Sequence, residues 1–171
     1  MPLYAKPHDL PTPVWLTDDD VARVELNRPR WCHHVLFLHN SVFWLGNRAE
    51  GRTQPGAWFI GGRVKIFTDV VDSLAQTVFR ETKLTIKKNR FRHIGQNRYF
   101  FDGADGGPAN DAVAEIFSVD LTDSEIVLAE LDPHEYSSAK LRPYDWPDIQ
   151  VLPDEMAIKV FSDLWRQLSP F

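Results

Sequence analysis

The sequence predicts an α+β fold in which a mixed β-sheet lies between helices. Three observations carry this prediction. Short apolar runs separated by turn residues predict several strands. An amphipathic pattern at residues 69–84 predicts a helix after a Gly-Gly turn, and a second such pattern at residues 153–168 predicts a helix near the end of the chain. More strands lie between the two helices, and this mixed order is typical of an α+β protein.

The first strands form a hairpin. The apolar runs "VLFL" and "VFWL" flank the polar residues His39, Asn40 and Ser41, which suit a tight turn. The run "AWFIGGRV" predicts one short strand that ends in glycines. In the helix of residues 69–84, Thr68 and Asp69 are expected to supply the N-cap and a first-turn acid.

After this helix, residues 86–101 and 112–121 alternate between polar and apolar side chains and predict two paired strands. The loop between them, residues 102–111, is rich in turn residues and can lie over a ligand. Residues 123–131 are ambiguous in their secondary structure. Residues 1–30 are predicted to be an N-terminal arm, because four prolines fall within the first 14 positions, and residues 31–171 to be one domain.

Charge and composition disfavour several classes of function. The 171 residues carry a net charge of −5, which disfavours general binding to nucleic acid or to an anionic membrane. No stretch approaches the roughly 18 apolar residues of a membrane span, so the cytoplasm is the expected location. The single cysteine, Cys32, cannot form an intramolecular disulfide and is expected to pack in a strand. A small-molecule ligand remains the expected partner.

Residues 32–121 resemble the Nudix hydrolases, with a looser match as far as Trp146. The Nudix signature, started on Gly62, fits at four of its nine defined positions: Gly62, Val78, Glu81 and Leu84. The context is similar as well, because a hairpin that ends in Arg48 is followed by a loop and then by "WFIGGRV", where Ile60 replaces the proline of the family. This sequence pattern is most similar to that of the GDP-mannose mannosyl hydrolase branch, which also has a reduced signature.

The resemblance implies a site for one divalent metal, Mg²⁺ or Mn²⁺. Thr77, Arg80 and Glu81 share one face of the helix by their spacing. In members with the full signature this face carries three carboxylates, whereas here Glu81 is alone. By resemblance, Glu81 and the backbone carbonyl of Gly61 hold the ion, and substrate phosphates complete its coordination. The alternative is that Glu81 is a solvated or ion-paired helix residue.

Several further residues are expected to act on the substrate. By resemblance, Arg48 and Arg63 contact the diphosphate and help the nucleotide to leave, as suits bidentate guanidinium groups. Arg52 is a weaker third candidate, and Arg80 can contact a phosphate itself. The alternative for these arginines is ordinary surface charge.

The general base is expected in "LDPHEYSSAKL". By resemblance His134 activates a water molecule there, and Glu135 is the fallback. The match is shifted by one residue, because His134 lies two positions before Tyr136 rather than three. Among the aromatic residues, Trp58 is the candidate for lining a binding cleft, although such strand aromatics commonly form core.

Two functions follow as hypotheses. The first is a Nudix-type hydrolase of a nucleoside diphosphate derivative, with a nucleotide sugar as the expected substrate and one divalent metal as cofactor. The second is a catalytically inactive Nudix-fold module that binds a nucleotide or regulates a partner, because three of the four glutamates of the signature are absent. A different reaction on the same fold, such as an isomerisation, is a third. The resemblance also implies a homodimer.

Overall fold

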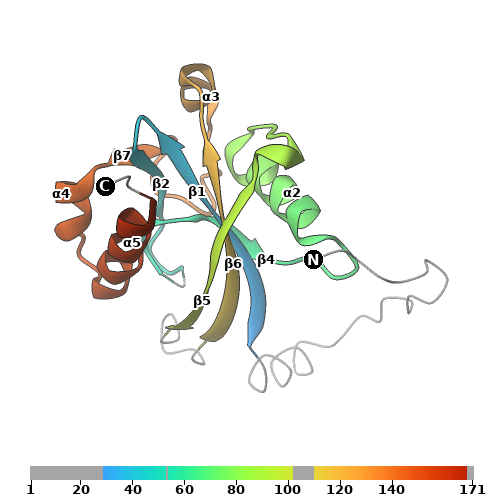
Figure 1. Ribbon diagram of the computed structural model, residues 1–171, viewed down its shortest axis with the longest axis horizontal. Coiled ribbons are helices and arrows are strands. Elements are labelled where there is room, and N and C mark those ends of the chain that lie inside the picture. Colours follow the sequence, from blue (N-terminus) through green and yellow to red (C-terminus); the bar gives the residue numbers. More distant parts are fainter. Residues whose placement is uncertain (1–28, 53, 102–109, 169–171) are drawn as a thin grey trace.

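A mixed β-sheet lies between two long helices in the computed structural model, which describes residues 29–52, 54–101 and 110–168 (Figure 1). Helix α2 (Val70–Thr82) covers one face of the sheet, and α5 (Glu155–Leu168) covers the other. This arrangement confirms the predicted α+β class. The predicted N-terminal arm, residues 1–30, lies outside the described residues except for its last two positions.

Strand β1 (Arg30–His39) is the centre of the sheet. It runs parallel to β6 (Asn110–Asp120) on one side, and β5 (Arg92–Phe101) pairs antiparallel with β6. On the other side β1 pairs antiparallel with two strands, β2 (Val42–Arg48) and β4 (Ile60–Arg63). Two short strands, β3 (Gly56–Trp58) and β7 (Arg142–Tyr144), pair with β2. The predicted pairing of the strands before and after residues 102–109 is therefore confirmed.

The β1–β2 hairpin is also confirmed. Its two turn residues, Asn40 and Ser41, have φ angles of 51° and 62°. Two consecutive positive φ angles match the two-residue hairpin turn whose twist agrees with that of the strands. Asn40 accepts such a conformation more easily than most residues.

The side chains of β1 alternate between two apolar cores. Leu36 and Leu38 point toward the side of the sheet that α5 covers, where Phe161 is fully buried. Val35 and Phe37 point toward the α2 side, where they pack with Leu74 and other helix residues. Since side chains in a strand alternate between faces, one apolar run can supply both cores.

The predicted single strand in "AWFIGGRV" is wrong, because the structure has two strands there. Strand β3 pairs with β2, whereas β4 pairs with β1 through Cys32–Val35. The reason lies in the edge of β1. Strand β2 already pairs with residues Phe37 to His39 of β1. Between Trp58 and Ile60 the chain therefore changes partner, from β2 to the part of β1 that β2 leaves unpaired.

Helix α2 begins one residue later than the sequence predicts. Asp69, not Thr68, is the N-cap, and its carboxylate accepts a hydrogen bond of 2.9 Å from the backbone N–H of Val71. The hydroxyl of Thr68 instead donates to the carbonyl of Ile66 at 3.2 Å. The helix ends at Lys83, which adopts the left-handed conformation with φ 60°.

Replacing Lys83 with glycine is expected to stabilise the protein by up to about 1 kcal/mol. A left-handed conformation costs a residue with a side chain about 1–2 kcal/mol, and glycine avoids this cost but loses some chain entropy. Urea unfolding of Lys83→Gly and Lys83→Ala checks the prediction, since alanine keeps the backbone strain. Equal stability of the two variants would contradict it.

Four elements were not assigned from the sequence. The ambiguous segment contains a short helix, α3 (Asp123–Leu128), whose N-cap Thr122 forms a reciprocal capping box with Glu125. Residues 88–90 form a 3₁₀ turn, so β5 begins only at Arg92. Strand β7 is followed by α4 (Trp146–Gln150), which starts with a capping box of Asp145 and Asp148. Within the described ranges, no helix has the length and apolar character needed to cross a membrane.

Candidate active site

The end of α2 is tied to the segment that follows α3. The backbone N–H of Glu130 donates to the carbonyl of Thr82 at 2.9 Å, and that of Asp132 donates to the carbonyl of Glu81 at 3.0 Å. These bonds satisfy carbonyls that a helix end leaves without partners. They also bring residues 134–136 toward the carboxylate of Glu81.

Both carboxylate oxygens of Glu81 are bonded to protein groups. The hydroxyl of Tyr136 donates to Oε2 at 2.6 Å, and Nη2 of Arg80 donates to Oε1 at 2.5 Å. Glu81 is only 3% exposed. Burial raises the pKa of Glu81, while the hydrogen bonds from Tyr136 and Arg80 act in the opposite direction. Glu81 is thus a buried, ion-paired helix residue.

Tyr136 reaches Glu81 because its backbone is fixed against the end of β2. Tyr136 forms an isolated antiparallel bridge with Arg48. Gly46 leaves space for the tyrosine ring, since a Cβ atom at this position would lie 2.5 Å from Cε1 of Tyr136. Burial raises the pKa of the Tyr136 hydroxyl well above its usual value, so the phenol remains a donor. Sequence reasoning missed this role, although a glycine inside an apolar strand often marks a close approach.

A second carboxylate, Glu135, lies beside two arginines. Its Oε2 is 3.5 Å from Nη2 of Arg48, and its Oε1 is 3.5 Å from Nη1 of Arg52. Nη2 of Arg52 also donates to the carbonyl of His134. The negative charge of Glu135 contributes to the raised pKa of Glu81, so the two carboxylates belong to one electrostatic environment. We call this set the arginine–glutamate cluster: Arg48, Arg52, Arg80, Glu81 and Glu135.

The structure therefore brings four predicted site residues into one cluster: Arg48, Arg52, Arg80 and Glu81. The side chain of His134 is exposed on the adjoining loop, and its backbone N–H donates to Oδ1 of Asp132 at 2.9 Å. The fallback base, Glu135, is a member of the cluster itself.

Arg63 and Trp58 lie outside the arginine–glutamate cluster. Arg63 is exposed at the end of β4 opposite Cys32, where its charge partly offsets the effect of burial, which raises the pKa of that thiol. Trp58 is 1% exposed and packs in the apolar core on the α5 side, with ring contacts to Phe59 and Phe161. Trp58 serves that core, as the second interpretation of the strand aromatics anticipated.

The two glycines that precede Arg63 differ in their surroundings. A Cβ atom on Gly61 would lie 2.2 Å from the backbone oxygen of His33, whereas a Cβ atom on Gly62 would meet nothing within 4 Å. Gly61 is thus required for the close pairing of β4 with β1. This steric role is independent of the metal role that the resemblance implies for its carbonyl.

The donor set for a divalent metal is small. Among the described residues, no group of three or more His, Cys, Asp and Glu side chains is arranged to hold an ion. Oε1 of Glu81 already binds one cation, the guanidinium of Arg80. A single carboxylate is compatible with an ion such as Mg²⁺, which often takes one or two carboxylates from the protein and its other ligands from water and phosphate oxygens.

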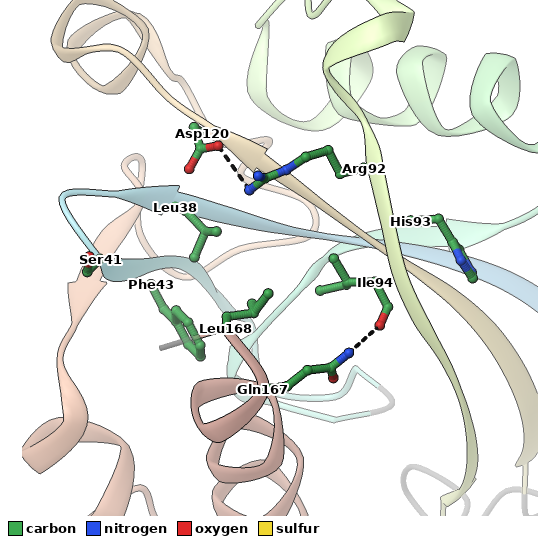
Figure 2. Close-up of a pocket in the computed structure, with 9 residues that line it drawn as sticks. All are labelled: Leu38, Ser41, Phe43, Arg92, His93, Ile94, Asp120, Gln167 and Leu168. Carbon is green, nitrogen blue, oxygen red and sulfur yellow. Dashed lines mark hydrogen bonds and ion pairs between the residues drawn. The ribbon is translucent and has the colours of Figure 1, made fainter. Parts of the chain in front are cut away.

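A separate pocket of about 420 Å³ lies on the α5 side of the sheet (Figure 2). Its apolar part comes from Leu38, Phe43, Ile94 and Leu168. Arg92 of β5 pairs with Asp120 of the neighbouring strand β6 at 3.0 Å, and Gln167 donates to the carbonyl of Ile94 at 2.8 Å. None of the predicted site residues lines this pocket, and the arginine–glutamate cluster belongs to the end of α2 on the opposite face.

Comparisons with known proteins give similar structures and no similar sequence. Neither a family model nor a curated protein matches the chain. A MutT protein from Methanosarcina mazei is 17% identical with a TM-score of 0.64, covering 83% of this chain and 96% of its own. A MutT Nudix hydrolase from Burkholderia pseudomallei is 14% identical with a TM-score of 0.62, covering 84% of this chain and 100% of its own.

A C. elegans Ap4A hydrolase is 13% identical with a TM-score of 0.54, covering 80% of this chain and 98% of its own. Sequence identities this low support a shared fold and leave the reaction open. The TM-scores of 0.54 to 0.64 and the near-complete coverage of these proteins agree on one point. The chain has the fold of the MutT and Nudix hydrolases.

Proposed function

We propose that the chain is a Nudix-type hydrolase of a nucleoside diphosphate derivative, with a nucleotide sugar as its substrate class. The observation that carries this proposal is the arginine–glutamate cluster. Three guanidinium groups converge on two carboxylates at the end of α2, on the fold of the Nudix hydrolases. The choice of a nucleotide sugar comes from the resemblance of "WFIGGRV" and Arg48 to the GDP-mannose mannosyl hydrolase branch.

The cluster suits a diphosphate by charge and by geometry. Three arginines against two glutamates leave one positive charge in excess. A guanidinium binds phosphate oxygens through two parallel hydrogen bonds, and such charge-assisted bonds are stronger than neutral ones. Glu135 pairs with Arg48 and Arg52, whereas Glu81 pairs with Arg80. A bound diphosphate would offer these guanidinium groups further anionic partners.

One Mg²⁺ or Mn²⁺ ion would be held by Glu81 and the carbonyl of Gly61, and it would neutralise charge on the diphosphate as the bond breaks. Tyr136 orients the Glu81 carboxylate through Oε2. His134 accepts the proton of the attacking water, with Glu135 next to it as the alternative base. The water oxygen forms a bond to the sugar carbon or to phosphorus, and the bond to the leaving nucleotide or phosphate breaks. Arg48 stabilises the charge on the leaving group. Arg63 lies outside the cluster, so its role at the leaving group stays a prediction from the resemblance.

Glu81→Gln is expected to lower turnover by about 100-fold or more, because a bound metal contributes several kcal/mol to such reactions. The measurement is hydrolysis of a panel of nucleoside diphosphate sugars and dinucleotides with Mg²⁺ or Mn²⁺. Glu130→Gln is the matched control, since Glu130 is an exposed glutamate near the same helix end. Turnover that is independent of metal and of Glu81 would contradict the proposal.

A second candidate is a catalytically inactive module that binds a nucleoside diphosphate. The observation that favours it is the state of Glu81, whose two oxygens are both bonded to protein donors. Thr68, Thr77 and Arg80 also stand where the full signature has other residues. Tight binding across the panel without turnover would support this candidate. A homodimer and a cytoplasmic location stay predictions from the sequence and the resemblance.

A further inference from the structure

We infer that Arg80 is an internal cation that exchanges with the divalent metal at Glu81, so that metal and diphosphate bind cooperatively. In the free protein Arg80 occupies Oε1 of Glu81. A bound diphosphate offers Arg80 another anionic partner and so releases Oε1 to the metal. This inference rests on the proposed diphosphate site and adds an order of events to it.

The two oxygens of Glu81 have different neighbours. Oε2 accepts the hydroxyl of Tyr136, whose ring is buried at 4% exposure beside Gly46. Oε1 accepts Nη2 of Arg80, and the Arg80 side chain is 56% exposed against 4% for that of Glu81. Oε1 is therefore covered by a side chain that reaches solvent, whereas Oε2 is bonded within the core. A ligand from solvent can replace the partner of Oε1 more easily than that of Oε2.

Charge makes the two cations alternatives at this oxygen. A guanidinium and a divalent ion at the same carboxylate repel each other, and the repulsion is strong because Glu81 is buried and weakly screened. Arg80 contacts Oε1 at 2.5 Å, so an ion that binds this oxygen has to displace it. Leaving Oε1 without any cation is also unfavourable, because burial penalises the charged carboxylate. The free protein should thus bind metal weakly.

Among the three cluster arginines, Arg80 is the one placed to move. The side chains of Arg48 and Arg52 are 23% and 40% exposed and share Glu135, and Arg52 is also bonded to the carbonyl of His134. Arg80 is the most exposed of the three. Its long side chain can turn from Glu81 to a phosphate oxygen without a change in the backbone of α2.

Cooperative binding follows from this exchange. Diphosphate binding removes the competitor of the metal, and metal binding frees Arg80 for the diphosphate. Linkage requires that each ligand raises the affinity for the other by the same factor. If the Arg80–Glu81 ion pair has no such role, neither ligand changes the affinity for the other. The two interpretations therefore differ in the measured coupling between metal and diphosphate binding.

The test is the binding of Mn²⁺ alone, followed by electron paramagnetic resonance of the free ion. Arg80→Gln is expected to bind Mn²⁺ about tenfold more tightly than the wild type, within the usual range of coupling factors. Lys83→Gln is the matched control, because it removes one positive charge from the same helix end, where the Lys83 side chain donates to the carbonyl of Arg80. Arg80→Gln combined with Glu81→Gln should lose the gained affinity.

A second measurement tests the other half of the exchange. Binding of ADP in the presence of EDTA is expected to weaken about fivefold or more in Arg80→Gln and to stay unchanged in Lys83→Gln. Mn²⁺ should also raise the melting temperature of Arg80→Gln more than that of the wild type, which confirms that the variant is folded.

The inference is overturned if Arg80→Gln and the wild type bind Mn²⁺ equally, or if neither binds it. Its failure is distinguishable from that of the proposed function, because the readouts are equilibrium affinities and not turnover. Metal-dependent turnover with unchanged Mn²⁺ affinity would refute the exchange alone. Tighter Mn²⁺ binding without turnover would support the exchange within a binding module.

Discussion

Gly61→Ala is expected to destabilise the protein by about 3 kcal/mol or more, a large part of the total stability of a typical domain. The added Cβ atom would lie 2.2 Å from the backbone oxygen of His33 and 2.9 Å from the Cα atom of His34. Backbone atoms of a central strand cannot turn away as a side chain can. Relief therefore requires β4 to move away from β1, which breaks the pairing of Gly61 with His34.

Gly62→Ala is the control for this prediction. The two glycines are adjacent in the same strand, and alanine at position 62 would meet no atom within 4 Å. Denaturant unfolding of both variants measures the difference. We expect Gly62→Ala to lie within about 0.5 kcal/mol of the wild type, as surface substitutions usually do. Similar losses of stability in the two variants would show that the close approach of β4 and β1 is not the cause.

The paired glycines also show how far sequence reasoning reached. The motif places Gly62 at the start of the signature, yet the structure needs Gly61 for packing. The resemblance specifies a spacing, while the steric requirement depends on which residue faces the backbone of β1. The register between β4 and β1 decides which glycine this is. It places Gly61 opposite His34, 27 positions earlier in the sequence. Local sequence carries no direct information on such a register.

Local signals predicted the main elements well. The β1–β2 hairpin and helices α2 and α5 follow from apolar periodicity and turn residues. Short elements were missed where the signal is two polar side chains in a capping box, as at Thr122 and Glu125 before α3. The split of β3 from β4 was missed because it depends on competition for one edge of β1.

The site was predicted only in part, because local sequence patterns do not show contacts between distant segments. Helical spacing correctly placed Arg80 beside Glu81. The role of Tyr136 was not predicted, because its hydroxyl meets Glu81 across 55 residues of sequence. The pairing of Arg48 and Arg52 with Glu135 depends likewise on the bridge between Arg48 and Tyr136. Contacts between distant segments form only once the sheet is assembled.

Acidification below about pH 6.5 is expected to destabilise the protein through two buried histidines on β1. Burial lowers the pKa of His33 to about 4 and that of His34 to about 3. The charges of Arg80 and Lys65 add to the effect on His33, and those of His33 and Arg48 add to the effect on His34. Within the described residues, Nδ1 of each ring is buried without a hydrogen-bond partner, so neither ring has a ready site for a second proton.

The direction of the effect follows from where the protons bind. In the unfolded chain both histidines take up protons near their ordinary pKa of about 6.5, whereas in the folded protein they stay neutral until the pH falls much lower. Their contribution to stability is therefore complete above pH 6.5 and is lost as the pH falls toward 4 for His33 and 3 for His34. Each histidine contributes a slope of up to about 1.4 kcal/mol per pH unit in this window.

Glu81 opposes this trend. Burial raises the pKa of its carboxyl, so the folded protein takes up that proton before the unfolded chain does and gains stability as the pH falls. The net slope is therefore smaller than the sum for two histidines. Urea unfolding from about pH 7.5 to pH 5 measures this slope, because few other carboxylates titrate in that range.

Variants assign the slope to individual histidines. His33→Asn loses the contact between Nε2 and the hydroxyl of Ser73, which is 2.8 Å long, and His34→Asn loses the stacking on Phe59. Both are expected to be less stable at neutral pH, but each should also reduce the pH slope by about 1.4 kcal/mol per pH unit at most. Val151→Ala changes an exposed side chain and removes no titratable group, so it should keep the wild-type slope. If the β1 variants keep that slope too, the acid sensitivity arises elsewhere in the protein.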